Sequence, residues 1–248
     1  MTEVFSHLFE GTIWKMDVYE PTGLLAIEWR DNEGVPKFSV IHFSSGELAI
    51  DAISYGDRWW TLAAITSKHL LLHHYPQANQ AQTSGLVAID IATGLVAWER
   101  FNLQFQEATK EGIAVKQGFS SNNKVAVLDE HTGTTSIAAV DLKNLGAYDR
   151  NIRPALPTNA MPPITLTKQA IIGPYFFLEH GIRQLWAYHV EKENGFRLNL
   201  AIIEGEEVIF NAGIIDHLNH LLPETFFIID QQLFFIRNNK REIVSYFV

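Results

Sequence analysis

The chain of 248 residues is 47% hydrophobic, contains no cysteine and carries a formal net charge of −9. An acidic chain lacks the basic patch that neutralises phosphates, so we expect no nucleic-acid partner. Without cysteine there are no disulfides, no thiol catalysis and no thiolate zinc site. No apolar run reaches the ~18 residues of a membrane helix, and the N-terminus lacks the pattern of a signal peptide. These features predict a cytoplasmic protein without a membrane partner.

One hairpin pattern recurs along the chain. Residues 85–100 place alternating apolar side chains on both sides of the turn Asp90–Gly94, and a glycine there can adopt the positive φ that hairpin turns require. Related turns end at Gly46, Gly133, Gly195 and Asn239. The turns recur about every 40 to 60 residues, which is typical of one four-stranded propeller blade per interval.

The strands predicted around these turns form five repeats of four. In chain order they are 11–19, 24–30, 37–43 and 47–53; 58–66, 69–75, 85–91 and 95–101; 104–110, 112–118, 124–128 and 134–140; 164–168, 175–179, 183–190 and 196–203; and 207–214, 225–229, 232–237 and 242–248. The repeats span 11–53, 58–102, 103–141, 160–204 and 206–248. They fill the chain, so we predict a single domain over residues 1–248.

Three segments are predicted to play other parts. Residues 143–163 contain four of the prolines, and because proline removes a ladder donor, this segment is predicted to connect the third and fourth repeats. Residues 216–223 are predicted to hold one helical turn that Pro223 ends. Before the first repeat, Phe5, Leu8 and Phe9 are predicted to cap a blade or to contact another subunit.

The strand pattern predicts an all-β fold, and among such folds a β-propeller of five four-stranded blades. Residues Leu70–Leu72 and Phe226–Ile228 are apolar at consecutive positions, so their sheets must be covered on both faces. Radial packing of sheets provides that cover and leaves only short edges. A two-sheet β-sandwich, which also uses many short strands, is the alternative.

Residues 85–98 resemble the repeat of quinoprotein-like (PQQ-repeat-like) β-propellers, in which Ala-x-Asp-x-x-Thr-Gly precedes a tryptophan. Here the pattern is Ala88, Asp90, Thr93, Gly94 and Trp98. Residues 125–133 match more weakly, with the aspartate and Thr-Gly but no tryptophan. The resemblance implies blades whose Asp, Thr and Trp side chains serve turn hydrogen bonds and packing between blades. It supplies no cofactor-contacting motif, so we expect no cofactor.

Four acidic residues are predicted at the loops that enter the innermost strands: Glu10, Asp57, Glu107 and Glu206. Two carboxyl groups facing each other across a channel mouth could hydrolyse a glycan as acid and base. The competing interpretation is chance, because a chain with 28 Asp and Glu residues places some of them near loops in any case.

Two other groups are weaker candidates for a site. Arg58, Trp59 and Trp60 could bind a ligand by stacking, although neighbouring strand residues point to opposite faces and both tryptophans could instead pack in the core. Asp216, His217 and His220 could chelate a metal from one helical turn. Their spacing matches no known metal motif, so we expect no metal.

The sequence also lacks a glycine-rich phosphate loop and a Gly-x-Ser-x-Gly motif. Without a catalytic signature, the fold favours a non-enzymatic module that binds a protein or a small-molecule ligand at the mouth of the propeller channel. A glycan hydrolase that uses the four acids is the alternative.

Overall fold

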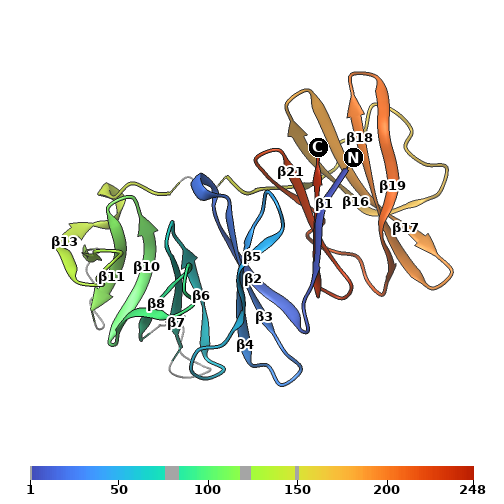
Figure 1. Ribbon diagram of the computed structural model, residues 1–248. Helices are drawn as coiled ribbons and strands as arrows, with labels where there is room; N and C mark the ends of the chain where they lie inside the picture. Colours follow the sequence, from blue (N-terminus) through green and yellow to red (C-terminus); the bar gives the residue numbers. More distant parts are fainter. Residues whose placement is uncertain (1, 76–83, 118–123, 149–150) are drawn as a thin grey trace. The chain divides into compact units, whose positions relative to one another are not determined.

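The computed structural model describes residues 2–75, 84–117, 124–148 and 151–248, and in these residues the chain is all-β. The described strands form five antiparallel sheets (Figure 1). Residues 9–150 make one compact unit, and residues 1–8 together with 151–248 make a second. Within the described ranges, no helix is long and apolar enough to cross a membrane.

Three sheets make up the first compact unit, each with its strands in chain order. Their strands are β2 (Thr12–Tyr19), β3 (Leu24–Arg30), β4 (Pro36–His42) and β5 (Glu47–Ile53); β6 (Trp60–Ile65), β7 (His69–His74), β8 (Leu86–Asp90) and β9 (Val96–Arg100); and β10 (Leu103–Thr109), β11 (Gly112–Gln117), β12 (Lys124–Leu128) and β13 (Thr135–Asp141). The twelve predicted strands of this region are confirmed to within two residues at each end, except that Gly118, predicted to end one of them, lies outside the described residues.

Two sheets make up the second compact unit. One runs in order through β15 (Leu156–Thr158), β16 (Ile171–His180), β17 (Arg183–Lys192), β18 (Gly195–Glu204) and β19 (Glu207–Leu218). The other has the order β1 (Thr2–Leu8), β22 (Glu242–Phe247), β21 (Gln232–Arg237), β20 (Phe227–Ile229) and β14 (Arg153–Pro154). All neighbouring strands are antiparallel.

The predicted strands of the fourth and fifth repeats are partly wrong. Residues 164–168 form no strand, and residues 207–214 belong to β19, in the same sheet as β18, rather than to the last sheet. The reason is a tight hairpin: Glu204 pairs with Glu207, and Gly205 between them has φ +61, which suits a two-residue turn. The repeat boundary predicted at 206 therefore falls inside a hairpin.

The last sheet takes its missing strand from the start of the chain. β1 pairs with β22 from Thr2 opposite Phe247 to Leu8 opposite Glu242, and Phe5 makes an edge contact with Phe234 at 6.2 Å. Phe5 and Leu8 are thus strand residues. A sheet of the second compact unit is built from segments near both ends of the sequence.

The proline-rich segment is more than a connection. Pro154 lies in β14 and Pro157 in β15, and each of these short strands is the edge of its sheet. Proline is tolerated there because an edge strand needs no donor on its open side. The helical turn predicted at 216–223 is wrong, because β19 continues to Leu218. Within this strand, His217 has a positive φ of 59°.

The sheet β6–β9 is covered on both faces, as its consecutive apolar residues require. Leu70 and Leu72 pack into a cluster shared with β3, β4 and β5, whereas Leu71 packs into a cluster shared with β10, β11 and β12. This alternation is the period of two that a strand imposes on its side chains. Three sheets of the first compact unit are thereby joined by two cores.

The first of these sheet contacts includes a buried carboxylate. Glu28 on β3 is 0% exposed. Its Oε2 accepts hydrogen bonds from the Thr61 hydroxyl and from the Leu62 N–H (2.8 Å), and its Oε1 accepts two from Arg30 (2.9 and 2.8 Å). Buried carboxylates are stable only when their oxygens are satisfied in this way.

Two neighbouring side chains of β2 complete the contact. Asp17 Oδ2 accepts from the Ile65 N–H (2.8 Å), and Lys15 Nζ donates to the Leu62 carbonyl (2.7 Å). β6 is the edge of its sheet, so these groups of its backbone have no neighbouring strand on that side. We call this arrangement of Lys15, Asp17 and Glu28 on the edge of β6 the β6 joint.

The second contact is built on a turn. Trp98 on β9 donates from Nε1 to the Glu130 carbonyl (2.8 Å), and its ring covers Gly133, where an added Cβ would lie 2.6 Å from a ring carbon. Arg100 donates to the carbonyls of Gly133 (2.7 Å) and Thr132 (2.8 Å). We call this packing of Trp98 and Arg100 on the turn 129–133 the turn joint.

The turns themselves are held by the aspartate and threonine of the repeated pattern. Asp90 Oδ1 accepts from the N–H and the hydroxyl of Thr93 (both 2.8 Å), and Asp129 Oδ1 accepts from those of Thr132 (both 2.9 Å). The threonine hydroxyl lowers the pKa of each carboxyl group, followed by the backbone N–H. These are the turn hydrogen bonds expected from the sequence.

Candidate functional site

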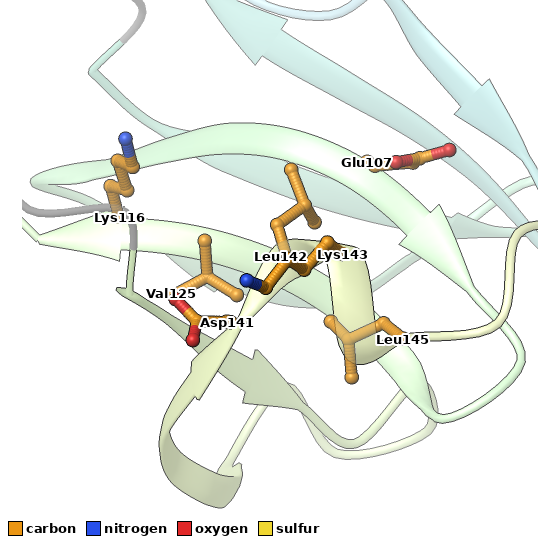
Figure 2. A pocket seen from close by; sticks show the side chains of 7 residues that line it. All are labelled: Glu107, Lys116, Val125, Asp141, Leu142, Lys143 and Leu145. Carbon is orange, nitrogen blue, oxygen red and sulfur yellow. The ribbon is translucent and has the colours of Figure 1, made fainter.

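A cavity of about 490 Å³ lies on the sheet β10–β13 and the 3₁₀ turn Leu142–Asn144 that follows β13. Its described lining residues are Glu107, Lys116, Val125, Asp141, Leu142, Lys143 and Leu145 (Figure 2). We call it the β10–β13 pocket. It combines charged side chains with an apolar wall inside one compact unit.

Each strand of the sheet contributes to the pocket. Glu107 follows an irregularity in the pairing of β10 with β11, Lys116 comes from β11, Val125 from β12 and Asp141 from the end of β13. A bulge re-aims the side chains next to it, which separates Glu107 from the regular alternation of its strand. The sheet therefore positions these four lining residues of the pocket.

The turn after β13 closes the other side. Asp141 precedes the 3₁₀ turn and makes no side-chain cap. The Leu145 N–H donates to the Leu142 carbonyl (3.0 Å), which fixes the turn that carries Leu142 and Lys143. The wall beneath is apolar, since Val125 is 2% exposed.

Among the described residues, the charges that line the pocket are balanced and unpaired. Two lysines, Lys116 and Lys143, stand with two acids, Glu107 and Asp141, and within the described part of the chain none of these four side chains has a hydrogen bond or an ion pair. Figure 2 shows Lys116 and Glu107 at opposite ends of the pocket, with Leu142 between them. Such an arrangement can hold a ligand that carries charge of both signs.

The four predicted acids are not gathered at this pocket. Glu107 lines it, and its described lining residues do not include Glu10, Asp57 or Glu206. Glu10 is exposed in the bend before β2, Asp57 is exposed in the turn before β6 with Oδ1 3.4 Å from His74 Nε2, and Glu206 lies in the β18–β19 turn of the second compact unit. Their role in hydrolysis stays a prediction.

The predicted ligand-binding residues divide between core and surface. Trp60 is 6% exposed and makes an edge contact with Tyr55 at 4.7 Å, so it is a core residue and presents no ring for stacking. Arg58 and Trp59 are exposed, and Arg58 also donates to the Glu33 carbonyl (3.2 Å). A ligand role for these two stays a prediction.

The weak metal candidates do not share a helical turn. Asp216 and His217 lie on β19, and His220 lies in the bend that follows. The Asp216 carboxylate accepts a hydrogen bond from Arg197 Nε. In the residues that the structure describes, no group of three His, Asp or Glu side chains is placed to hold a metal ion.

The first compact unit contains a buried histidine that no sequence motif marks as a site residue. His73 on β7 is 8% exposed, and neither ring nitrogen has a hydrogen-bond partner in the described residues. Burial, followed by the positive charge of Lys15, lowers its pKa to about 4. With that pKa the ring is neutral at pH 7. It contacts two aromatic side chains, Tyr75 at 5.1 Å and Phe105 at 5.8 Å.

Sequence reasoning found Glu107 but missed the other charged residues of the pocket. Lys116 and Asp141 stand near the ends of β11 and β13, and Lys143 follows two residues later. The available signal was the run of Asp141, Leu142 and Lys143, which places opposite charges around an apolar residue directly after a strand. That signal identifies a sheet end but does not show which strand ends meet.

Residues 18–98 match a family model described as a domain of unknown function (DUF4905). The match covers less than half of the chain, from the end of β2 to the middle of β9, and it stops before the β10–β13 pocket. A search of curated proteins found no match.

Proposed function

We propose that this protein is a non-enzymatic binding module that holds a small molecule in the β10–β13 pocket. The observation that carries the proposal is a set of four charged side chains around an apolar wall, none of which has a partner among the described residues. The cavity of about 490 Å³ falls within the ~300–1,000 Å³ that is usual for small-molecule sites. The site lies on one sheet, which differs from the channel mouth expected from the sequence.

The pocket favours ligand binding over hydrolysis as its function. A glycosidase needs a carboxyl group that stays protonated, usually through burial in an apolar pocket. The two carboxyl groups of the pocket, Glu107 and Asp141, are both half-buried at an open surface. Their position suits recognition of a charged group on a ligand.

The scaffold we propose for this module is a five-bladed β-propeller. Three consecutive four-stranded meanders, and two further sheets of which one is completed by β1, support the proposal. The turn joint supports it as well, because a tryptophan of one sheet packs on the turn of the next in sequence. Pairing of β1 with β22 supplies the kind of closure that a ring of sheets needs.

Binding can be tested by titrating ¹⁵N-labelled protein with a library of small polar and amphipathic fragments and following amide shifts. We expect a subset of fragments to move the resonances of the sheet β10–β13 and of the turn after it. Leu145→Trp should fill the pocket and abolish those shifts. The matched control is Leu156→Trp, since Leu156 is 64% exposed and lies in the second compact unit. Failure of every fragment to move these resonances would overturn the proposal.

The propeller can be tested with spin labels, because the absence of cysteine permits two introduced cysteines without background. Labels at Ala139 on β13 and Ile209 on β19 lie on exposed positions of two sheets that follow one another in sequence. A closed ring predicts one narrow distribution of distances between the two labels, measured by double electron–electron resonance. A broad distribution would reject the ring and leave the binding proposal standing.

A further inference from the structure

We infer that the ligand of the β10–β13 pocket is a small zwitterion with its amino and carboxylate groups at opposite ends of an apolar body, as in a short peptide with free termini. The inference rests on the proposed function, namely that this pocket binds a small molecule. It adds the chemical class of that molecule. Three features of the pocket carry it: the sign of the charges, their positions and the wall between them.

The charges of the described lining residues favour a ligand that carries both signs. Lys116 and Lys143 would attract an anion, but Glu107 and Asp141 would repel it, and the reverse holds for a cation. A neutral apolar ligand would cover the half-buried Glu107 and Lys116 without pairing either of them, and covering a charge without a partner is unfavourable. A zwitterion satisfies groups of both signs and brings no net charge.

The positions of the charges set the separation on the ligand. Figure 2 shows Glu107 and Lys116 at the two ends of the pocket. A free α-amino acid carries its ammonium and its carboxylate on the same carbon, so its two charges cannot be set apart. A short peptide places its ammonium at one end and its carboxylate at the other, so that the ammonium can meet Glu107 and the carboxylate can meet Lys116.

The wall between the ends is apolar. Val125 is buried, and Leu142 and Leu145 are half-buried beside it. Apolar side chains of a ligand gain free energy by leaving water on such a wall, at about 25 cal/mol per Å². A peptide with aliphatic side chains would therefore use all three features, whereas a neutral glycan lacks both the charges and the aliphatic groups.

The test uses isothermal titration with one dipeptide and its blocked forms. L-leucyl-L-leucine is compared with its N-acetyl form, its C-terminal amide, and the form blocked at both ends. We expect the free dipeptide to bind at least about tenfold more tightly than either singly blocked form, because charge-assisted hydrogen bonds contribute roughly a factor of ten each. The doubly blocked form should bind most weakly.

Two variants assign the ends of the ligand. Glu107→Gln should weaken binding of the free dipeptide about tenfold and leave the N-acetyl form unaffected, since that form has no ammonium to lose. Lys116→Gln should weaken the free dipeptide and leave the amide form unaffected. Glu193→Gln and Lys68→Gln change the same charges at exposed positions outside the pocket and should leave all four affinities unchanged.

The outcomes separate this inference from the proposed function. If all four dipeptide forms bind equally, or none binds while fragments still shift the resonances of the β10–β13 pocket, the zwitterion is rejected and the binding module stands. If neither dipeptides nor fragments shift those resonances, both are rejected. If the variants change the free and the blocked forms alike, Glu107 and Lys116 do not contact the ends of the ligand, and the inference fails.

Discussion

The β6 joint and the turn joint perform the same task with opposite chemistry. At the β6 joint a carboxylate that is 0% exposed accepts hydrogen bonds from a backbone N–H, a hydroxyl and a guanidinium group. At the turn joint an indole ring covers a glycine, and the hydrogen bonds run to carbonyls of a surface turn. One joint depends on a buried charge and the other on an aromatic contact.

The chemistry of each joint determines how well it tolerates a substitution. A buried charge that loses a partner is left uncompensated, which costs several kcal/mol, whereas a surface turn that loses a hydrogen bond can turn to water. A single substitution in the β6 joint should therefore lower the free energy of unfolding strongly, whereas a single substitution in the turn joint should lower it less. Four experiments test this difference between the joints.

The largest effect is expected at Glu28. Glu28→Ala leaves Thr61, the Leu62 N–H and Arg30 without their acceptor, and should lower the free energy of unfolding by about 3–5 kcal/mol. Urea titration measures it. The matched control is Glu33→Ala at an exposed position of the same sheet's hairpin, which should change stability by less than about 0.5 kcal/mol. Equal effects would show that the buried carboxylate has no special role.

Acid should act next to the β6 joint through His73, which pairs with Thr61 across β6 and β7 and whose pKa is lowered by burial and then by the charge of Lys15 in that joint. Its pKa of about 4 in the folded state lies below the ~6.5 of an unfolded histidine. The folded protein thus binds fewer protons between these values, and stability present above pH 6.5 is lost as the pH falls toward 4, by at most about 3 kcal/mol.

Urea titrations across this pH range test the point. His73→Leu should make the slope measurably shallower, whereas His220→Gln, at an exposed position, should leave it unchanged. His189, which is 0% exposed and whose pKa is also lowered by burial, retains its own share in the second compact unit. An unchanged slope in His73→Leu would contradict the assignment.

Acid should reach the turn joint later. Burial opposes the ionisation of Glu130, but hydrogen bonds from His69 and Thr66 outweigh it and lower its pKa below the usual 4.5. Stability from this ionised group is complete above that value and is lost only as the pH falls further. The two joints therefore respond to different parts of an acid titration.

Two glycines measure the packing of the turn joint. Gly94 and Gly133 have similar positive φ, +69 and +62, but an added Cβ meets nothing within 4 Å at Gly94, whereas at Gly133 it meets the Trp98 ring. Both alanine variants share the strain of the left-handed region. Gly133→Ala should cost an additional ~1–3 kcal/mol for displacing the ring. Equal losses in thermal unfolding would show that the ring moves freely.

The smallest effect is expected from trimming the indole. Trp98→Phe removes the donor to the Glu130 carbonyl and part of the buried ring, so it should cost about 1–2 kcal/mol in urea titration. Trp59→Phe, at a side chain that is 37% exposed, serves as the control and should be nearly neutral. A loss as large as that of Glu28→Ala would erase the contrast between the joints.

The sequence predicts the first compact unit well because its strands pair with their neighbours along the chain. Each turn there follows its strand within a few residues, and the Asp-x-x-Thr-Gly pattern marks two of them. The turn hydrogen bonds of Asp90 and Asp129 follow from the same local pattern. Local chemistry is visible in a single sequence, so these features needed no information about the fold.

The second compact unit is less predictable because its pairings are not local. Thr2 lies opposite Phe247, and no pattern near either residue indicates the other. Pro154 and Pro157 indicated a connection, since an edge strand and a loop both tolerate proline. The same limit applies to the pocket: Glu107, Lys116 and Asp141 come from three strands, and only the register of the sheet brings them together.

The pairing of β1 with β22 sets an order for folding. β1 is synthesised before its partner strand, which follows it by more than two hundred residues. Until then β1 is an unpaired strand of the kind that aggregates with other chains. The closing step of the fold thus carries a high loop-closure entropy and should limit the folding rate, while the three local meanders of the first compact unit can form during synthesis.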